Sequence, residues 1–217
     1  MSAVMLWQGE LPPVCREEAL RYAGVKTETP QMGAMLDECR ALCEGQIHPR
    51  VCCARYPVRR SGELLDLGFA QTDSAALRRN LAGCEEIVLF AATIGLEMDR
   101  LIARYAHLSP ARSVMLQAIG TERIESLCDA FEECLIAQGH DLRPRFSPGY
   151  GDLPLALQRD IFAALDCPRQ IGVSLNESLL MTPSKSVTAI IGLGDEQGES
   201  CVHNCAACTL KECLYRR

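Results

Sequence analysis

The sequence has no excess of positive charge, the feature that nucleic-acid-binding proteins use to hold phosphate groups. Its 22 Lys and Arg residues are outnumbered by 28 Asp and Glu residues, and the formal net charge is −6 at pH 7. Because affinity for a phosphate backbone depends on contacts from Lys and Arg, this balance argues against nucleic acid as a partner.

Long apolar runs are also missing. The longest, at residues 87–96, is well short of the roughly 18 apolar residues that a transmembrane helix needs. Residues 1–7 contain no basic start followed by an apolar stretch, which is the pattern of a secretory signal peptide. We therefore expect a soluble cytoplasmic protein that has no membrane partner.

The cysteines do not form the even set that a disulfide framework requires. There are 13 of them, and an odd number without a signal peptide predicts reduced thiols. Nine are scattered over the first 200 residues, mostly on apolar helical faces, where free cysteine behaves as a small hydrophobic residue. The other four, called the tail cysteines below, are Cys201, Cys205, Cys208 and Cys213.

The tail cysteines follow the pattern C-x3-C-x2-C-x4-C within thirteen residues. Four thiolates at this spacing can satisfy either a tetrahedral zinc ion or an iron–sulfur cluster, and the spacing alone does not choose between them. His48 and His203 could replace a thiolate as metal ligands, although each is also explained as an ordinary solvent-exposed histidine. Lys211, Arg216 and Arg217 flank the thiolates and would offset their negative charge.

Enough apolar residues are present to build a folded core. The 217 residues are 48% hydrophobic, and the length predicts one compact domain with or without a small appendage. Predicted helices cover residues 15–23, 31–43, 74–81, 95–105, 110–139 and 152–165, and predicted strands cover residues 51–58, 64–69, 87–93, 171–175 and 187–193. Asp152 is expected to cap the last of these helices, and Pro168 to end it.

The order of these elements indicates the fold class. Helices and strands neither alternate regularly nor segregate, which favours an α+β fold with a largely antiparallel sheet. We divide the chain into an N-terminal helical unit (residues 1–50), a core (residues 51–194) and a Cys-rich tail (residues 195–217).

The long helix carries one candidate site residue, Glu125. A projection of 100° per residue places it on the same face as the apolar residues Ala111, Val114, Met115 and Ala118. A carboxylate there needs a partner. Alternatively, the buried face turns toward Leu127, Cys128 and Phe131, which would leave Glu125 at a solvated margin.

The irregular segment at residues 145–150 carries the other candidates. It combines the forked guanidinium of Arg145 with Ser147, a stiffening proline, the permissive Gly149 and the ring of Tyr150. This set suits a zwitterionic or carboxylate ligand, although the same residues also make an ordinary ordered turn. Hydroxyl groups in residues 176–178 and 182–186 are adequately explained by turn and capping roles.

Several of these segments together resemble the reactivation domain of cobalamin-dependent methionine synthase. The run R-F-S-P-G-Y at 145–150 resembles that family's R-x-x-x-G-Y loop, and residues 171–187 resemble its T-E-S-x-x-M-x-P-x-x-S-V segment. Residues 90–99 resemble its A-V-T-x-G-L-E-x-D stretch, and Glu125 matches a glutamate of the helix that follows. The family also uses an aspartate near its N-terminus and a pair of tyrosines after its last strand. Neither has a counterpart in this sequence.

The resemblance implies a C-shaped fold that binds S-adenosylmethionine (AdoMet) without the Gly-rich loop of Rossmann methyltransferases, and the sequence contains no G-x-G-x-x-G. It also implies a function. In that family the domain supplies the methyl group that converts oxidised cob(II)alamin, once reduced again, to methylcobalamin. The expected partners are a cobalamin-binding methionine synthase or another corrinoid protein, together with an electron donor.

The same resemblance implies roles for the candidate residues. Arg145 would hold the ligand carboxylate, Ser147 and Gly149 would contact the ligand, Tyr150 would line it, and Glu125 would face a positive charge. A [4Fe-4S] cluster in the tail would additionally supply the electron that cob(II)alamin must receive, which zinc would not. There are two alternatives. The first is a non-catalytic module that binds a partner through a tail folded around a metal ion, and the second is an iron–sulfur electron carrier for a corrinoid protein.

Overall fold

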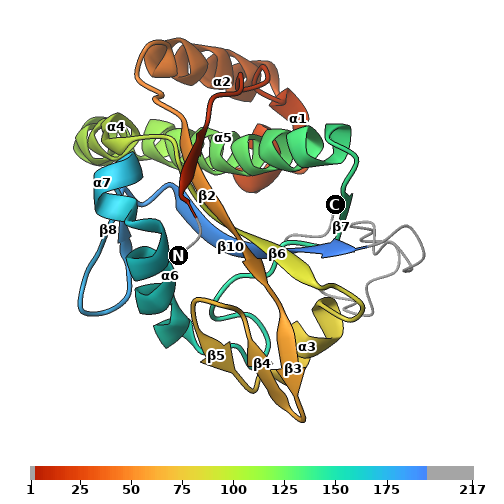
Figure 1. The fold of residues 1–217 in the computed structure, drawn as a ribbon. Coiled ribbons are helices and arrows are strands. Elements are labelled where there is room, and N and C mark those ends of the chain that lie inside the picture. Colours follow the sequence, from red (N-terminus) through yellow and green to blue (C-terminus); the bar gives the residue numbers. More distant parts are fainter. Residues whose placement is uncertain (1–2, 195–217) are drawn as a thin grey trace.

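The computed structural model describes residues 3–194, in which a five-stranded sheet is covered by helices (Figure 1). In chain order the elements are β1 (Met5–Trp7), α1 (Arg16–Tyr22), α2 (Pro30–Cys43), β2 (Arg50–Pro57), β3 (Arg59–Ser61), β4 (Leu64–Asp66), β5 (Gln71–Thr72), α3 (Ala75–Asn80), β6 (Glu86–Thr93), α4 (Leu96–Leu108), α5 (Pro110–Ala137), β7 (Asp141–Leu142), the 3-10 turn η1 (Leu155–Leu157), α6 (Gln158–Leu165), α7 (Cys167–Ile171), β8 (Ser174–Leu175), β9 (Met181–Thr182) and β10 (Ser186–Gly194).

The main sheet has the strand order β1-β2-β6-β10-β7, and every neighbouring pair in it is antiparallel. The central strand β6 is apolar and buried on both faces, which explains its continuous hydrophobic run. In its register Phe90 lies opposite Cys53 of β2 on one side and Ala189 of β10 on the other. The predicted antiparallel sheet is confirmed.

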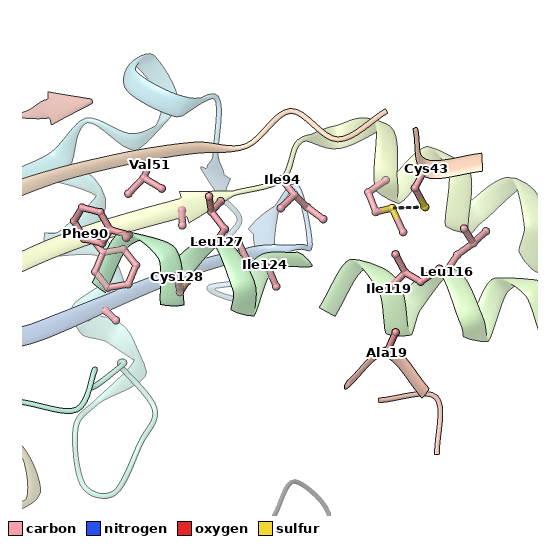
Figure 2. Packing of buried hydrophobic residues seen from close by; sticks show 14 of the residues in the cluster. Ala19, Cys43, Val51, Phe90, Ile94, Leu116, Ile119, Ile124, Leu127 and Cys128 are labelled. Carbon is pink, nitrogen blue, oxygen red and sulfur yellow. Dashed lines mark hydrogen bonds between the residues drawn. The ribbon is translucent and has the colours of Figure 1, made fainter. Parts of the chain in front are cut away.

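The two faces of the sheet carry two separate apolar clusters. Alternate residues of β6, including Val88 and Phe90, face α1, α2, α4 and α5, whereas Ile87 and Leu89 face α3, α6 and α7. Figure 2 shows the first cluster, where Val51 and Phe90 of the sheet lie beside α5. The same helix also contacts β7, the outermost strand, which pairs with β10.

The cysteines within residues 3–194 are unpaired, and seven of these nine are buried. Burial raises the pKa of Cys43 to about 12 and that of Cys53 to about 11. These thiols are therefore neutral at pH 7 and act as small apolar side chains, as the sequence predicted.

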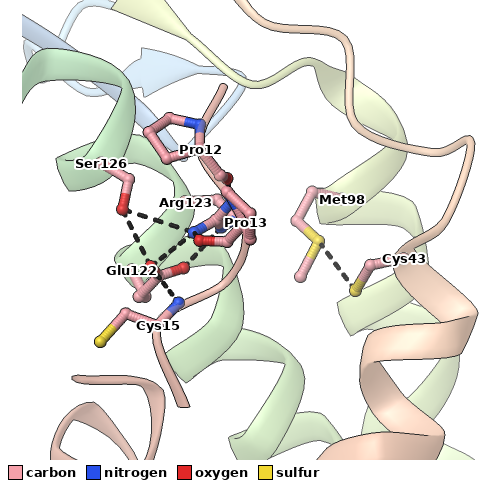
Figure 3. Close-up of polar contacts among 8 residues, drawn as sticks. All are labelled: Pro12, Pro13, Cys15, Cys43, Met98, Glu122, Arg123 and Ser126. Carbon is pink, nitrogen blue, oxygen red and sulfur yellow. Dashed lines mark hydrogen bonds and ion pairs between the residues drawn. The ribbon is translucent and has the colours of Figure 1, made fainter. Parts of the chain in front are cut away.

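A buried ion pair ties the N-terminal segment to α5 (Figure 3). Glu122 and Arg123 contact each other, and their side chains are only 2% and 3% exposed. Glu122 accepts a hydrogen bond from the backbone N–H of Cys15 at 3.0 Å, and Arg123 donates to the carbonyls of Pro12 and Pro13. Residues 3–50 thus contribute β1 to the main sheet and α1 and α2 to the surface of α5.

The structure corrects the predicted role of Asp152. It does not cap the helix that follows it, because residues 155–157 form a 3-10 turn and α6 begins only at Gln158. Its carboxylate instead accepts hydrogen bonds from the hydroxyl of Ser74 and from the N–H groups of Ala75 and Ala76. Asp152 therefore supports the N-terminus of α3, which is distant in the sequence.

Two boundaries near α7 also differ from the prediction. The helix α6 ends at Leu165 because Asp166 adopts a left-handed conformation, with φ of 49°, so Pro168 does not end it. Pro168 lies instead in the first turn of α7, where the missing N–H of proline is tolerated. The strand predicted over residues 171–175 is limited to Ser174–Leu175, since Ile171 ends α7.

Candidate functional site

The loop at residues 145–150, called the ligand loop below, begins at the edge of the main sheet. Phe146 and Ile190 of β10 exchange two backbone hydrogen bonds of 2.8 and 2.9 Å. The ring of Phe146 packs on the apolar cluster of the α6 face. The backbone at the start of the loop is thereby fixed to the sheet.

The second half of the ligand loop is a tight turn. The N–H of Tyr150 donates to the carbonyl of Ser147 at 3.1 Å, and the N–H of Gly149 donates to Leu153 at 2.9 Å. Proline at the second position and glycine with φ of +92° at the third are the residues that a type II turn requires. The turn holds the ring of Tyr150 edge-on to Phe146 and leaves it 61% exposed.

Arg145 points back from this loop onto α5. Its side chain is 12% exposed, and its guanidinium contacts three carboxylates of that helix, at 2.7 Å from Glu125, 2.8 Å from Asp129 and 2.8 Å from Glu132. Burial alone would favour the neutral guanidine. The attraction of the three carboxylates outweighs that effect and raises the pKa of Arg145 above its ordinary value.

The four side chains of this cluster carry more negative than positive charge. Three carboxylates face one guanidinium, so the formal charges of these four side chains alone sum to −2. The three hydrogen bonds use three of the five N–H groups of Arg145, and the contacts described for residues 3–194 give the other two no acceptor. The site can therefore attract a cationic group while still offering two donors to a carboxylate.

Glu125 lies where the second of the two sequence interpretations placed it. Its side chain is 33% exposed, and the buried face of α5 turns toward Leu127, Cys128 and Phe131. Val114, which the first interpretation put on that face, is 56% exposed. The partner that the carboxylate needs is Arg145.

Asp129 and Glu132 belong to the site but were not identified from the sequence. The signal was nevertheless present, because residues 125, 129 and 132 are spaced by four and three positions and so lie on one face of a helix. Three acids in this spacing, without a basic residue among them on the same face, indicate a cation from elsewhere in the chain.

The hydroxyl groups of Ser184 and Ser186, in the segment 182–186, have structural partners. Ser184 donates through its N–H and its hydroxyl to Asp99 of α4, at 2.7 and 2.6 Å, and Ser186 donates to the carbonyl of Pro183 at 2.8 Å. The ammonium of Lys185 donates to Thr121, one helical turn before Glu125, at 2.9 Å. Only the bond from Ser186 to Pro183 has the turn role that was expected, whereas Ser184 and Lys185 fasten the segment to α4 and α5.

Two kinds of feature are absent between residues 3 and 194. No three His, Cys, Asp or Glu side chains there lie close enough together to hold a metal ion, and no helix is long and apolar enough to cross a membrane. The tail cysteines and His203 lie outside the described residues, so the predicted metal centre stays a prediction.

The geometry defines an α+β domain with an antiparallel sheet and a polar site at its edge, which is distinct from the parallel sheet of a Rossmann fold. A solved structure described as the MetH reactivation domain bound to AdoHcy is similar to it. The similarity covers 91% of this chain and 80% of that chain, with a TM-score of 0.63 and 17% sequence identity. No family model and no curated protein matches the chain.

This likeness shows the fold. The chain has the fold of the MetH reactivation domain, the same domain that the sequence motifs resemble. The predicted α+β, activation-domain-like fold is thereby confirmed.

Proposed function

We propose that this protein binds AdoMet between the ligand loop and α5 and supports the reductive methylation of cob(II)alamin on a partner corrinoid protein, such as a cobalamin-dependent methionine synthase. The observation that carries the proposal is the cluster of Arg145 with three carboxylates beside an exposed tyrosine and a Pro-Gly turn. Further support comes from the fold, because the similar MetH domain was solved with AdoHcy bound.

The reaction itself makes few chemical demands on the protein. After an electron donor reduces cob(II)alamin to cob(I)alamin, cobalt attacks the sulfonium methyl group, a Co–C bond forms, and the S–CH3 bond breaks with its electron pair passing to sulfur. The products are methylcobalamin and S-adenosylhomocysteine (AdoHcy). Because the sulfonium is already a good leaving group, no acid or base is needed, and the contribution of the protein is to position the ligand.

The charges of the site fit the ligand that this reaction uses. AdoMet carries a sulfonium and an ammonium besides its carboxylate, whereas AdoHcy has lost the sulfonium charge. The carboxylates of Glu125 and Glu132 beside Arg145 favour the sulfonium, and the two remaining N–H groups of Arg145 suit the carboxylate. A site of this kind should bind the methyl donor more tightly than the demethylated product.

Replacing Glu125 by glutamine tests this assignment. The variant should bind AdoMet about threefold to tenfold more weakly, because one negative charge near the sulfonium is lost, and should bind AdoHcy with little change. Isothermal calorimetry at low salt measures both affinities. Glu133→Gln is the matched control, since Glu133 is an exposed residue of α5 outside the Arg145 cluster. An equal loss for both ligands would mean that Glu125 has a structural role, and no AdoMet binding by the wild-type protein would refute the function.

We further propose that the tail cysteines hold one metal centre, [4Fe-4S] in preference to zinc, because a cluster could pass an electron to cob(II)alamin. The support is the spacing of four cysteines within thirteen residues. A protein with a cluster but without affinity for AdoMet would instead be the electron carrier considered above. A tail that holds zinc, together with a site that binds nothing, would favour the docking module.

A chain truncated after Gly194 tests the metal proposal. The cut leaves β10 intact, because Gly194 is its last residue and pairs with Asp141. The truncated protein should lose its iron, as measured by elemental analysis and by the visible spectrum of anaerobically purified protein. It should keep its affinity for AdoMet, as measured by calorimetry. Full metal content in the truncated chain would place the centre elsewhere, and zinc without iron in the full chain would exclude the redox role.

A further inference from the structure

We infer that α3 positions the ligand loop, and that Asp152 and Asn80 are the positioning residues that fasten its two ends. Asp152 lies just after the loop and Pro144, which Asn80 contacts, lies just before it. The inference rests on the proposed function only in naming AdoMet as the ligand whose binding the positioning serves.

The end that follows the loop is held at the N-terminus of α3. The carboxylate of Asp152 accepts hydrogen bonds from the hydroxyl of Ser74, from the N–H of Ala75 at 2.8 Å and from the N–H of Ala76 at 3.1 Å. Ser74 is buried and also caps the helix by accepting from Leu77. These bonds, with that of Ser74 contributing most, lower the pKa of Asp152 below its ordinary value.

The end that precedes the loop is held at the C-terminus of α3. The side-chain amide of Asn80 donates to the carbonyl of Pro144 at 3.0 Å, immediately before Arg145. Arg143 donates to the carbonyl of Ala82, just beyond the helix, at 3.2 Å. The two ends of the loop are therefore attached to opposite ends of one helix.

The first turn of α3 lies close to the backbone at Gly151, the residue directly after the loop. Gly151 has φ of +55°, and a Cβ atom added there would lie 2.8 Å from the Cβ of Ala76. On its other side α3 is anchored by Leu77, which is fully buried in the second apolar cluster. A six-residue helix is about 9 Å long and stiff, so it sets the distance between the ends of the loop.

This arrangement prepares the loop for binding before the ligand arrives. With both ends fixed, the turn at Pro148 and Gly149 is held in the conformation that presents Tyr150 and directs Arg145 onto α5. If the attachments were lost, the loop would spend less time in this conformation, and the apparent dissociation constant would rise in inverse proportion to that fraction.

The test measures loop order and ligand affinity in Asp152→Ala and Asn80→Ala. Amide hydrogen exchange in the ligand-free protein should accelerate at Gly149 and Tyr150, whose N–H groups close the turn, and should not change in β6. AdoMet affinity by calorimetry should fall about threefold to tenfold. Asp152→Asn, which keeps an acceptor oxygen, should recover part of both effects.

Asp73→Ala is the matched control, because Asp73 is an exposed carboxylate beside the same helix end and, within residues 3–194, does not bond to the loop. It should leave exchange and affinity as in the wild type. Wild-type exchange at Gly149 and Tyr150 in Asp152→Ala would overturn the inference, as would faster exchange with unchanged affinity. A wild-type protein that does not bind AdoMet would refute the proposed function instead, and loop exchange in the free protein would still decide the positioning role.

Discussion

Replacing Glu122 by alanine should lower the free energy of unfolding by about 3–5 kcal/mol, because it leaves the charge of Arg123 buried without its partner. Both side chains are almost fully buried, and Glu122 also accepts hydrogen bonds from the N–H of Cys15 and the hydroxyl of Ser126. The variant therefore loses the attachment of the N-terminal segment as well as the ion pair. Urea denaturation followed by circular dichroism measures the change.

The control for this prediction is Glu97→Ala, which breaks a pair of the same chemistry at the surface. Glu97 contacts Arg100 at 3.2 Å, and the arginine side chain is 70% exposed. Surface pairs of this kind contribute on the order of 0.2–1 kcal/mol. Similar losses in the two variants would mean that burial gives the Glu122–Arg123 pair no special role.

Replacing Arg145 by alanine should weaken AdoMet binding about tenfold to hundredfold, because the ligand carboxylate loses its charge-assisted hydrogen bonds. The same change removes the cation that Glu125, Asp129 and Glu132 share. We therefore also expect a lower melting temperature at low ionic strength that added salt partly restores. Calorimetry measures the first effect and thermal unfolding the second.

Arg145→Lys separates these two roles. Lysine restores the positive charge among the carboxylates, so the melting temperature should recover, but it lacks the planar fork and should not restore AdoMet affinity. An Arg145→Ala protein that folds and binds AdoMet as tightly as the wild type would show that the ligand lies elsewhere.

Much of the fold follows from local features of the sequence. The strands at residues 86–93 and 186–194 are predictable because a central strand buried on both faces must be apolar throughout its length. The start of α3 is predictable because Ser74 is a good capping residue and its hydroxyl does accept from Leu77. In each case the decisive interaction is local or depends only on burial.

The contacts that build the site are not local. Asp152 resembles a cap for the helix after it, but its partners are Ala75 and Ala76, more than seventy residues earlier in the chain. Only the folded structure brings α3 beside the ligand loop. Sequence rules consider neighbours within one or two turns, so they assigned Asp152 to the wrong helix.

Glu125 illustrates a second limit, which is the length of α5. Near its start the helix packs against α4 and leaves Val114 exposed, whereas near its end it packs on the sheet through Leu127 and Phe131. The buried face therefore shifts along its 28 residues. A projection started from residues 111–118 does not hold at residue 125.

The outermost strands of the main sheet are very short, with three residues in β1 and two in β7, beside central strands of eight or nine. A long outer strand would present a row of free N–H and C=O groups to which another protein chain can add, and this is a common start of aggregation. Here β1 covers one end of the sheet, while β7 and the backbone of Phe146 cover part of the other. The ligand loop therefore has a second effect, since the backbone of Phe146, which fixes the start of the loop, also limits the growth of the sheet from one molecule into the next.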